Sequence, residues 1–247
     1  MADHGDSPVS CLLVHGLGGG PYELEPLARR LEQSGRFVLS LTLPGHEKDH
    51  TRVMPASRWQ DWAQAVEEGF DQLAAFGRPV AVVGFSTGGT LALLLARRRP
   101  VARLVLLAPF LSIRYANLVP LLKPENYLAW IGRFFPNIPR FSPPVRDAEA
   151  RARFAQEERF RTFNLPATLS ALELIKRVQP DLPRITTPTL ILQGARERVV
   201  DPQGARTIYE RLGSAEKSLV WLPQSDHLLI HDVDRDLALR ESVNFLS

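Results

Sequence analysis

Cysteine is nearly absent from this sequence: Cys11 is the single one among 247 residues. One thiol excludes an intrachain disulfide framework and is typical of proteins from a reducing compartment. Residues 1–6 have neither the basic nor the apolar region of a secretory signal. The longest apolar run, residues 104–113, is too short to span a bilayer. We therefore predict a cytoplasmic protein with no membrane span.

The sequence also lacks a large excess of positive or negative charge. Lys and Arg number 30 against 27 Asp and Glu, so the formal net charge is +3. The basic residues are dispersed apart from Arg97–Arg99, which follow an apolar segment and suit the C-terminal end of a helix. We therefore expect no nucleic-acid partner.

Clusters of metal-ligating side chains are missing as well. His46 and His50 are close in sequence, but no neighbouring ligands complete a metal site around them. We therefore expect no metal site.

Six short apolar runs are typical of buried strands. They are rich in Val, Leu and Ile without polar alternation, as in a parallel sheet that is covered on both faces. Helical patterns separate most of them, which favours a doubly wound α/β fold. The runs are Val9–Val14, Phe37–Leu43, Pro79–Gly84, Val101–Leu107, Thr189–Leu192 and Ser218–Leu222.

Two helix starts have recognisable signals. Ser57 and Gln60 have the spacing of a capping box, in which the serine hydroxyl accepts a backbone N–H. Asp201 before Pro202 is typical of an N-cap followed by the first helical residue.

Residues 109–182 separate two predicted strands by far more than one crossover helix requires. Seven of the 20 prolines lie in the first half of this stretch, among aromatic residues that a solvated linker would not carry. We interpret it as a lid over the C-terminal edge of the sheet, where open α/β sheets bind ligands. The core is then residues 1–108 and 183–247. The alternative is a set of extra helices that support the core without contacting a ligand.

Gly84-Phe85-Ser86-Thr87-Gly88 match G-x-S-x-G directly after a predicted strand and before a predicted helix. In this context the motif marks a nucleophilic serine. The sharp turn strains the serine backbone, and the glycines at 84, 88 and 89 avoid collisions around it. We predict Ser86 as the nucleophile.

A glycine-rich loop, His15–Gly20, follows the first predicted strand. Acyl transfer creates an oxyanion that needs preorganised N–H donors, and we predict the backbone N–H groups of Leu17 and Thr87 in this role. The competing interpretation is a phosphate-binding loop. The sequence matches neither G-x-x-x-x-G-K-[ST] nor a strict dinucleotide fingerprint.

The general base is expected late in the chain, because this architecture orders its residues as serine, acid and histidine. His227 and His231 both follow the last predicted strand. His227 lies in the loop that returns to the strand edge beside Ser86, and we predict it as the base. His231, followed by Asp232, leads into the final helix, and we assign it a structural role.

Together these motifs resemble the bacterial carboxylesterase and monoacylglycerol lipase branch of the α/β-hydrolase superfamily. The resemblance implies the α/β-hydrolase fold, with a mostly parallel sheet of about six to seven strands and an inserted lid. It also implies hydrolysis of a carboxylic ester through an acyl-enzyme, without metal or cofactor. The apolar lid favours a small ester with an apolar acyl group. The matching segments are His15–Gly19, Pro44–His46, Asp61-Trp62, Gly84–Gly89 and Ser225–His227.

The chain departs from this resemblance at the acid, where an aspartate is usual. Residues 193–202 read QGARERVVDP, and without a gap Glu197 takes the place of the aspartate. Glutamate can orient a histidine in the same way, so Glu197 is our predicted acid. Asp201 is the alternative, although an N-cap role already explains it. Asp226 adjoins His227 and would point away from its ring.

Other functions remain open at this stage. The same three residues could act on a thioester, an amide or a carbon–carbon bond, and this fold also holds lyases and cofactor-free peroxidases. A binding protein that lost the reaction is the alternative from another class, although such proteins usually lack the nucleophile or the histidine, and both are present here.

Converting the acid to its amide preserves its shape and disturbs the histidine tautomer, which costs about 10,000-fold in kcat in the serine proteases. We expect Glu197→Gln to lose at least about a hundredfold in kcat. Asp201→Asn should lose little, because asparagine is an equally good N-cap. Steady-state rates at neutral pH test both variants, with thermal melts as the folding control. An inactive Asp201→Asn beside an active Glu197→Gln would move the acid to Asp201.

Overall fold

A six-stranded parallel sheet, in the order β2-β1-β3-β4-β7-β8, forms the centre of the molecule. The structure, a computed structural model, describes residues 9–47, 52–112, 124–140, 142–156 and 160–247. The predicted fold is confirmed, and each of the six apolar runs overlaps one strand. The strands are β1 (Ser10–Val14), β2 (Val38–Leu41), β3 (Val80–Phe85), β4 (Leu104–Leu107), β7 (Thr189–Gly194) and β8 (Lys217–Leu222).

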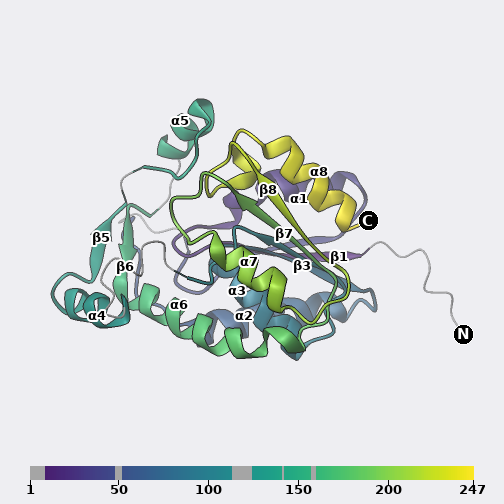
Figure 1. Cartoon of the computed structure of the whole chain (residues 1–247), viewed down its shortest axis with the longest axis horizontal. Helices are drawn as coiled ribbons and strands as arrows, with labels where there is room; N and C mark the ends of the chain where they lie inside the picture. The colour runs from purple at the N-terminus through teal and green to yellow at the C-terminus, as the bar shows by residue number, and fades with distance from the viewer. Residues whose placement is uncertain (1–8, 48–51, 113–123, 141, 157–159) are drawn as a thin grey trace, which may run out of the picture.

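Helices cover both faces of the sheet (Figure 1). One face carries α1 (Glu25–Gln33) and α8 (Arg235–Phe245), which pack against each other. The other face carries α2 (Trp59–Ala74), α3 (Thr87–Arg98), α6 (Leu165–Val178) and α7 (Gln203–Arg211). Within the described ranges, no helix is both long and apolar enough to cross a membrane.

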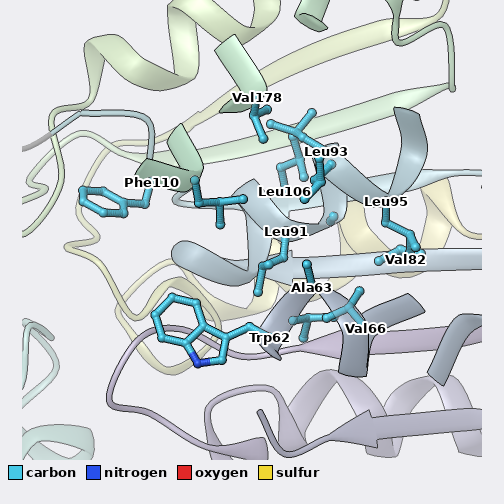
Figure 2. Packing of buried hydrophobic residues seen from close by; sticks show 14 of the residues in the cluster. Trp62, Ala63, Val66, Val82, Leu91, Leu93, Leu95, Leu106, Phe110 and Val178 are labelled. Atoms are coloured by element: carbon cyan, nitrogen blue, oxygen red, sulfur yellow. The ribbon is translucent and has the colours of Figure 1, made fainter. Parts of the chain in front are cut away.

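Each face of the sheet has its own hydrophobic core, because successive side chains of a strand point to opposite faces. On β1, Leu12 belongs to the core under α2 and α3, whereas Leu13 belongs to the core under α1 and α8. Figure 2 shows the first of these, where the fully buried Trp62 of α2 lies close to Leu91 of α3. Burial on both faces explains why the strands read as continuous apolar runs.

The strand register places the predicted nucleophile next to the glycine-rich loop. β3 ends at Phe85 and α3 begins at Thr87, so Ser86 alone makes the turn between them. Val14, the last residue of β1, pairs with Gly84 of β3. The loop that follows Val14 therefore starts beside the strand that delivers Ser86.

The insertion between β4 and β7 has two parts. α4 (Pro124–Phe134), α5 (Ala148–Gln156) and an antiparallel pair, β5 (Asn137–Pro139) and β6 (Thr162–Asn164), lie beyond the end of the main sheet, at left in Figure 1. α6 instead packs against α2 and α3, with Ala171, Leu174 and Val178 in their core. The lid predicted over residues 109–182 stays a proposal, in which α6 contacts both the core helices and α4.

The predicted capping box at Ser57 is wrong. The N-cap residue of α2 is Arg58, and Ser57 Oγ is buried with no hydrogen-bond partner among the described residues. The Ser170 hydroxyl of α6 accepts the Trp59 N–H instead, at 2.8 Å. A residue 111 positions away therefore caps this helix, which local spacing could not reveal.

A Cβ atom at Gly88 would lie 2.1 Å from the Val14 carbonyl oxygen, whereas at Gly89 its nearest contact would be Pro109 Cβ at 3.2 Å. We expect Gly88→Ala to lower the free energy of unfolding by at least about 2 kcal/mol, because β1 or α3 must shift. Gly89→Ala is the matched control and should cost less than about 1 kcal/mol, since alanine favours the helix. Urea unfolding followed by circular dichroism measures both, and equal losses would contradict the steric explanation.

Candidate active site

Ser86 occupies a strained position between β3 and α3. Its backbone has φ 53° and ψ −117°, a conformation that residues with side chains rarely adopt. Gly84 has room only for hydrogen, because a Cβ there would lie 2.4 Å from the Gly88 carbonyl oxygen. The turn places Ser86 on the wall of a cavity, where the residue is 7% exposed.

The peptide between Gly16 and Leu17 is held in one orientation. The Gly16 carbonyl oxygen accepts the Gly19 N–H at 3.1 Å and lies 2.9 Å from His15 Nδ1. His15 Nε2 accepts the Leu43 N–H at 3.0 Å, so Nδ1 carries the ring proton and donates it to Gly16. Burial lowers the pKa of His15 to about 3, which keeps the ring neutral in this arrangement.

Two backbone N–H groups are available beside Ser86. A peptide is planar and trans, so fixing the Gly16 carbonyl directs the Leu17 N–H the opposite way. Thr87 is the first residue of α3, where N–H groups have no partner within the helix. Hydrogen bonds among the described residues engage neither N–H, and both residues line the same cavity as Ser86.

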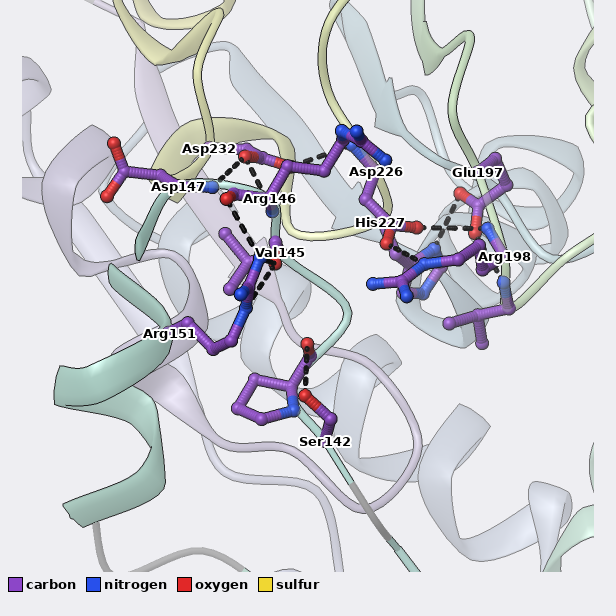
Figure 3. Close-up of polar contacts among 12 residues, drawn as sticks. Ser142, Val145, Arg146, Asp147, Arg151, Glu197, Arg198, Asp226, His227 and Asp232 are labelled. Carbon is purple, nitrogen blue, oxygen red and sulfur yellow. Dashed lines mark hydrogen bonds and ion pairs between the residues drawn. The ribbon is translucent and has the colours of Figure 1, made fainter. Parts of the chain in front are cut away.

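Glu197 and His227 meet, although they are 30 residues apart in sequence. Figure 3 shows the contact, in which His227 Nδ1 lies 2.8 Å from Glu197 Oε2 and both side chains are buried. The carboxylate also accepts the N–H groups of Val199 and Val200, at 2.7 and 3.2 Å, and the Gln193 amide, at 3.2 Å. Burial alone would raise the pKa of Glu197, but His227 and the backbone donors hold it below its ordinary value. The carboxylate therefore stays ionised and can accept a hydrogen bond from Nδ1–H.

The other candidate acids are engaged elsewhere. Asp201 accepts the Gln203 N–H at 3.0 Å just before α7, but the predicted N-cap position is wrong by one residue, because α7 begins at Gln203 with Pro202 as its N-cap. Asp226 accepts the Arg198 backbone N–H at 2.9 Å and pairs with the guanidinium of the same residue. Its carboxylate thus ties the loop of Glu197 to the loop of His227.

The insertion supports the loop that carries His227. The Pro144 carbonyl oxygen accepts the N–H groups of His227 and Leu228, each at 3.2 Å. From the other side, the ring of Phe85 packs against the His227 imidazole with 4.9 Å between centroids. The residue before Ser86 and the insertion therefore hold His227 in place together.

Asp232 has a role in the structure that the sequence analysis did not assign. Its fully buried carboxylate accepts the N–H groups of Arg146, Asp147 and Val233 at 2.8 Å and that of Asp226 at 2.7 Å (Figure 3). One side chain thereby joins the insertion to the residue before the histidine. The only sequence signal is an aspartate five residues after a candidate base, and this spacing does not reveal the donors.

The remaining histidines have other surroundings. His4 and His50 lie outside the described residues. His46 packs beside His15 with 5.1 Å between ring centroids, and the described part of the chain contains no group of three side chains suited to a metal ion. His231 donates from Nε2 to a backbone carbonyl at 3.0 Å, and burial lowers its pKa to about 4.

A cavity of about 470 Å³ collects the candidate groups at the end of β3. Ser86, Thr87, Leu17 and His227 line its wall. Most of its other walls are apolar and come largely from the insertion. These apolar residues include Phe110, Tyr127, Leu128, Ile138, Phe154, Phe163 and Leu165.

Comparison with known families gives a match that spans nearly the whole chain. The family described as serine aminopeptidase, S33, matches residues 6–234. The chain belongs to this family. The resemblance to the α/β-hydrolases is thereby confirmed, and the match includes all the candidate site residues.

Relatives of this hydrolase include lipases and esterases. The thermostable monoacylglycerol lipase of Bacillus sp. strain H-257 is 30% identical, over 98% of this chain and 92% of the lipase. The carboxylesterase of Bacillus subtilis strain 168 is 24% identical, over 98% and 93%. Human monoglyceride lipase is 26% identical, over 90% and 77%.

Solved structures share the fold. A structure from work on the metagenome-derived lipolytic enzymes LipS and LipT superimposes with a TM-score of 0.84 at 25% identity, over 97% of this chain and 94% of that one. The monoacylglycerol lipase of Paleococcus ferrophilus superimposes with a TM-score of 0.79 at 21% identity, over 97% and 95%.

The position of Glu197 leads to a prediction about side-chain length. Glu197→Asp would retain the charge but draw the carboxylate back by one carbon–carbon bond, about 1.5 Å. We expect kcat to fall by about a hundredfold, because displacements of this size misalign catalytic groups. Glu210→Asp, at an exposed position on α7, is the matched control. Wild-type kcat in a folded Glu197→Asp would show that this carboxylate does not orient His227.

Proposed function

We propose that this protein is a serine carboxylic-ester hydrolase that acts on esters with an apolar acyl group. The observation that carries the proposal is the meeting of four groups on one cavity: the strained Ser86, His227 backed by Glu197, and the N–H groups of Leu17 and Thr87. Each has the chemistry that acyl transfer needs. The lipases and esterases among the relatives support the same reaction class.

The first half-reaction forms an acyl-enzyme. Ser86 Oγ bonds to the ester carbonyl carbon while His227 Nε2 takes the hydroxyl proton, and the carbonyl electron pair moves to the oxygen. The N–H groups of Leu17 and Thr87 stabilise that oxyanion. Glu197 keeps the second imidazole proton on Nδ1 and stabilises the imidazolium. When the oxyanion collapses, His227 protonates the leaving alcohol.

The second half-reaction releases the acid. Water takes the place of the alcohol and gives a proton to His227, and its oxygen bonds to the acyl carbon. Collapse of the second oxyanion breaks the bond to Ser86 Oγ, which recovers the proton from His227. The enzyme returns to its starting state without a metal or redox step.

The cavity favours an apolar acyl chain. Its volume of about 470 Å³ is in the range of small-molecule sites, and the insertion contributes many of the aromatic and aliphatic side chains that line it. Hydrolysis rates for p-nitrophenyl esters from acetate to palmitate, together with a monoacylglycerol, define the preferred chain. Thioesters and amides in the same panel test the alternative uses of these residues.

Replacing the nucleophile gives the sharpest test. Ser86→Ala should lower kcat by about a million-fold, as loss of the nucleophile does in subtilisin. It should also abolish covalent labelling by a fluorophosphonate, with folding retained because the change removes only one hydroxyl. Rates with a purified p-nitrophenyl ester and labelling on a gel measure both effects.

A folded Ser86→Ala that keeps a tenth of the wild-type rate would overturn the mechanism. Cys11 offers no ready substitute, because it is buried in β1 and burial raises the pKa of its thiol to about 11. A wild-type protein that neither hydrolyses any ester nor reacts with the probe would favour the binding-protein alternative.

A further inference from the structure

A buried carboxyl group in the cavity takes no part in the steps above. Glu23 ends a short 3-10 helix, Pro21–Glu23, that follows the glycine-rich loop. It is 7% exposed and lines the same cavity as Ser86 and His227. Burying a carboxyl group lowers the stability of the folded protein unless hydrogen bonds and opposite charges compensate it. The surroundings of Glu23 therefore indicate its role.

The Glu23 carboxylate fills the inside of the glycine-rich loop. Its Oε2 accepts the Gly16 N–H at 3.1 Å. A Cβ added at Gly19 would lie only 1.9 Å from the same oxygen, so the loop closes around the carboxylate at a glycine. The Gly20 backbone lies close enough to lower the pKa of this carboxyl group as well.

These contacts fix the backbone that presents the Leu17 N–H. Gly16 is held at its N–H by Glu23 and at its carbonyl by Gly19 and His15. With both sides of Gly16 bound, the next peptide unit has little freedom to rotate, and its N–H is the proposed oxyanion donor. Loss of one anchor would let this donor move by the fraction of an ångström to which oxyanion stabilisation is sensitive.

A negative charge so close to the oxyanion would oppose catalysis unless it were balanced. Burial raises the pKa of Glu23, and the Arg140 guanidinium counters this rise. Arg140 extends from the end of β5 and donates to the Gly18 carbonyl oxygen, so it binds the same loop. Its guanidinium also stacks 4.3 Å from the centroid of the Phe163 ring on β6.

We propose that Glu23 is a positioning residue for the oxyanion hole, and that Arg140 of the insertion balances its charge and fastens the same loop. The inference rests on the proposed ester hydrolysis. Glu23 touches no reacting atom in this scheme; it acts through the Gly16–Leu17 peptide. The insertion then contributes to transition-state stabilisation as well as to the walls of the cavity.

Glu23→Gln tests this role with nearly unchanged shape. The amide offers one acceptor oxygen where the carboxylate offered two, and its NH2 group cannot accept the Gly16 N–H or any other N–H of the loop. We expect kcat to fall by about ten- to a hundredfold with KM changed less than about twofold, because an oxyanion donor acts in the transition state only. Glu25→Gln is the matched control: Glu25 is exposed, pairs with Arg29 on the surface and should keep the wild-type rate.

A tetrahedral adduct separates positioning from a general structural role. A trifluoromethyl ketone with the preferred acyl chain adds to Ser86 and carries an oxyanion, whereas the corresponding methyl carbinol fills the cavity without one. Glu23→Gln should weaken the ketone by the same factor as kcat/KM and leave the carbinol unchanged. Equal weakening of both ligands, or a wild-type affinity for the ketone, would overturn the proposal.

Variants of Arg140 provide a second, independent test. The test compares the single and double variants with each other, so it remains informative if Glu23→Gln alone folds poorly. Arg140→Met leaves the Glu23 charge unbalanced and should lower kcat more than Glu23→Gln does. The double variant should be more active than Arg140→Met alone, because it removes the unbalanced charge. Additive losses would contradict the charge balance. An inactive wild-type protein would instead refute ester hydrolysis itself, so the two failures are distinguishable.

Discussion

The close approach of β1, β3 and the first turn of α3 is the constraint on which the rest of the site depends. Gly88 of α3 lies against the Val14 carbonyl, and Gly84 of β3 lies against the Gly88 carbonyl, with no room for a Cβ atom at either glycine. This packing forces the strained turn at Ser86. It also brings the glycine-rich loop to the nucleophile, because a Cβ at Gly16 would lie 3.1 Å from Ser86 Cβ. The proposed nucleophile and the proposed oxyanion donors are therefore positioned by the same close packing.

The insertion lines the cavity and also forms hydrogen bonds with the loops that carry the candidate site residues. The Pro144 carbonyl holds the backbone of the His227 loop, Asp232 joins that loop to residues 146–147, and Arg140 reaches the glycine-rich loop from β5. These contacts are backbone hydrogen bonds to buried or charged groups, which are strong in a site that excludes water. Movement of the insertion would therefore alter the positions of both His227 and the glycine-rich loop.

Several donors hold the Glu197 carboxylate where it contacts His227. Glu197 is the first acidic residue after β7, and its carboxylate is fixed by two backbone N–H groups and by the Gln193 amide. Asp226, although adjacent to His227, is directed to Arg198. Sequence adjacency is thus a poor guide to which carboxylate meets an imidazole, since side chains of neighbouring residues in an extended loop point apart.

The sequence alone determined the sheet, the sharp turn at Ser86 and the loop at His15–Gly20. Apolar runs indicate strands that are buried on both faces, and glycines mark positions where the packing leaves no room for a side chain. Chain order and the family resemblance pointed to Glu197 as the partner of His227, and the structure brings the two side chains into contact, whereas the role of the contact stays a proposal. Only the tertiary structure decided that Ser170 caps α2, that Asp232 binds the insertion and that Glu23 lies inside the glycine-rich loop. In each of these contacts a buried polar group finds its hydrogen-bond partner in another segment of the chain or on the far side of a loop. Such partners are set by packing, and no local pattern encodes them.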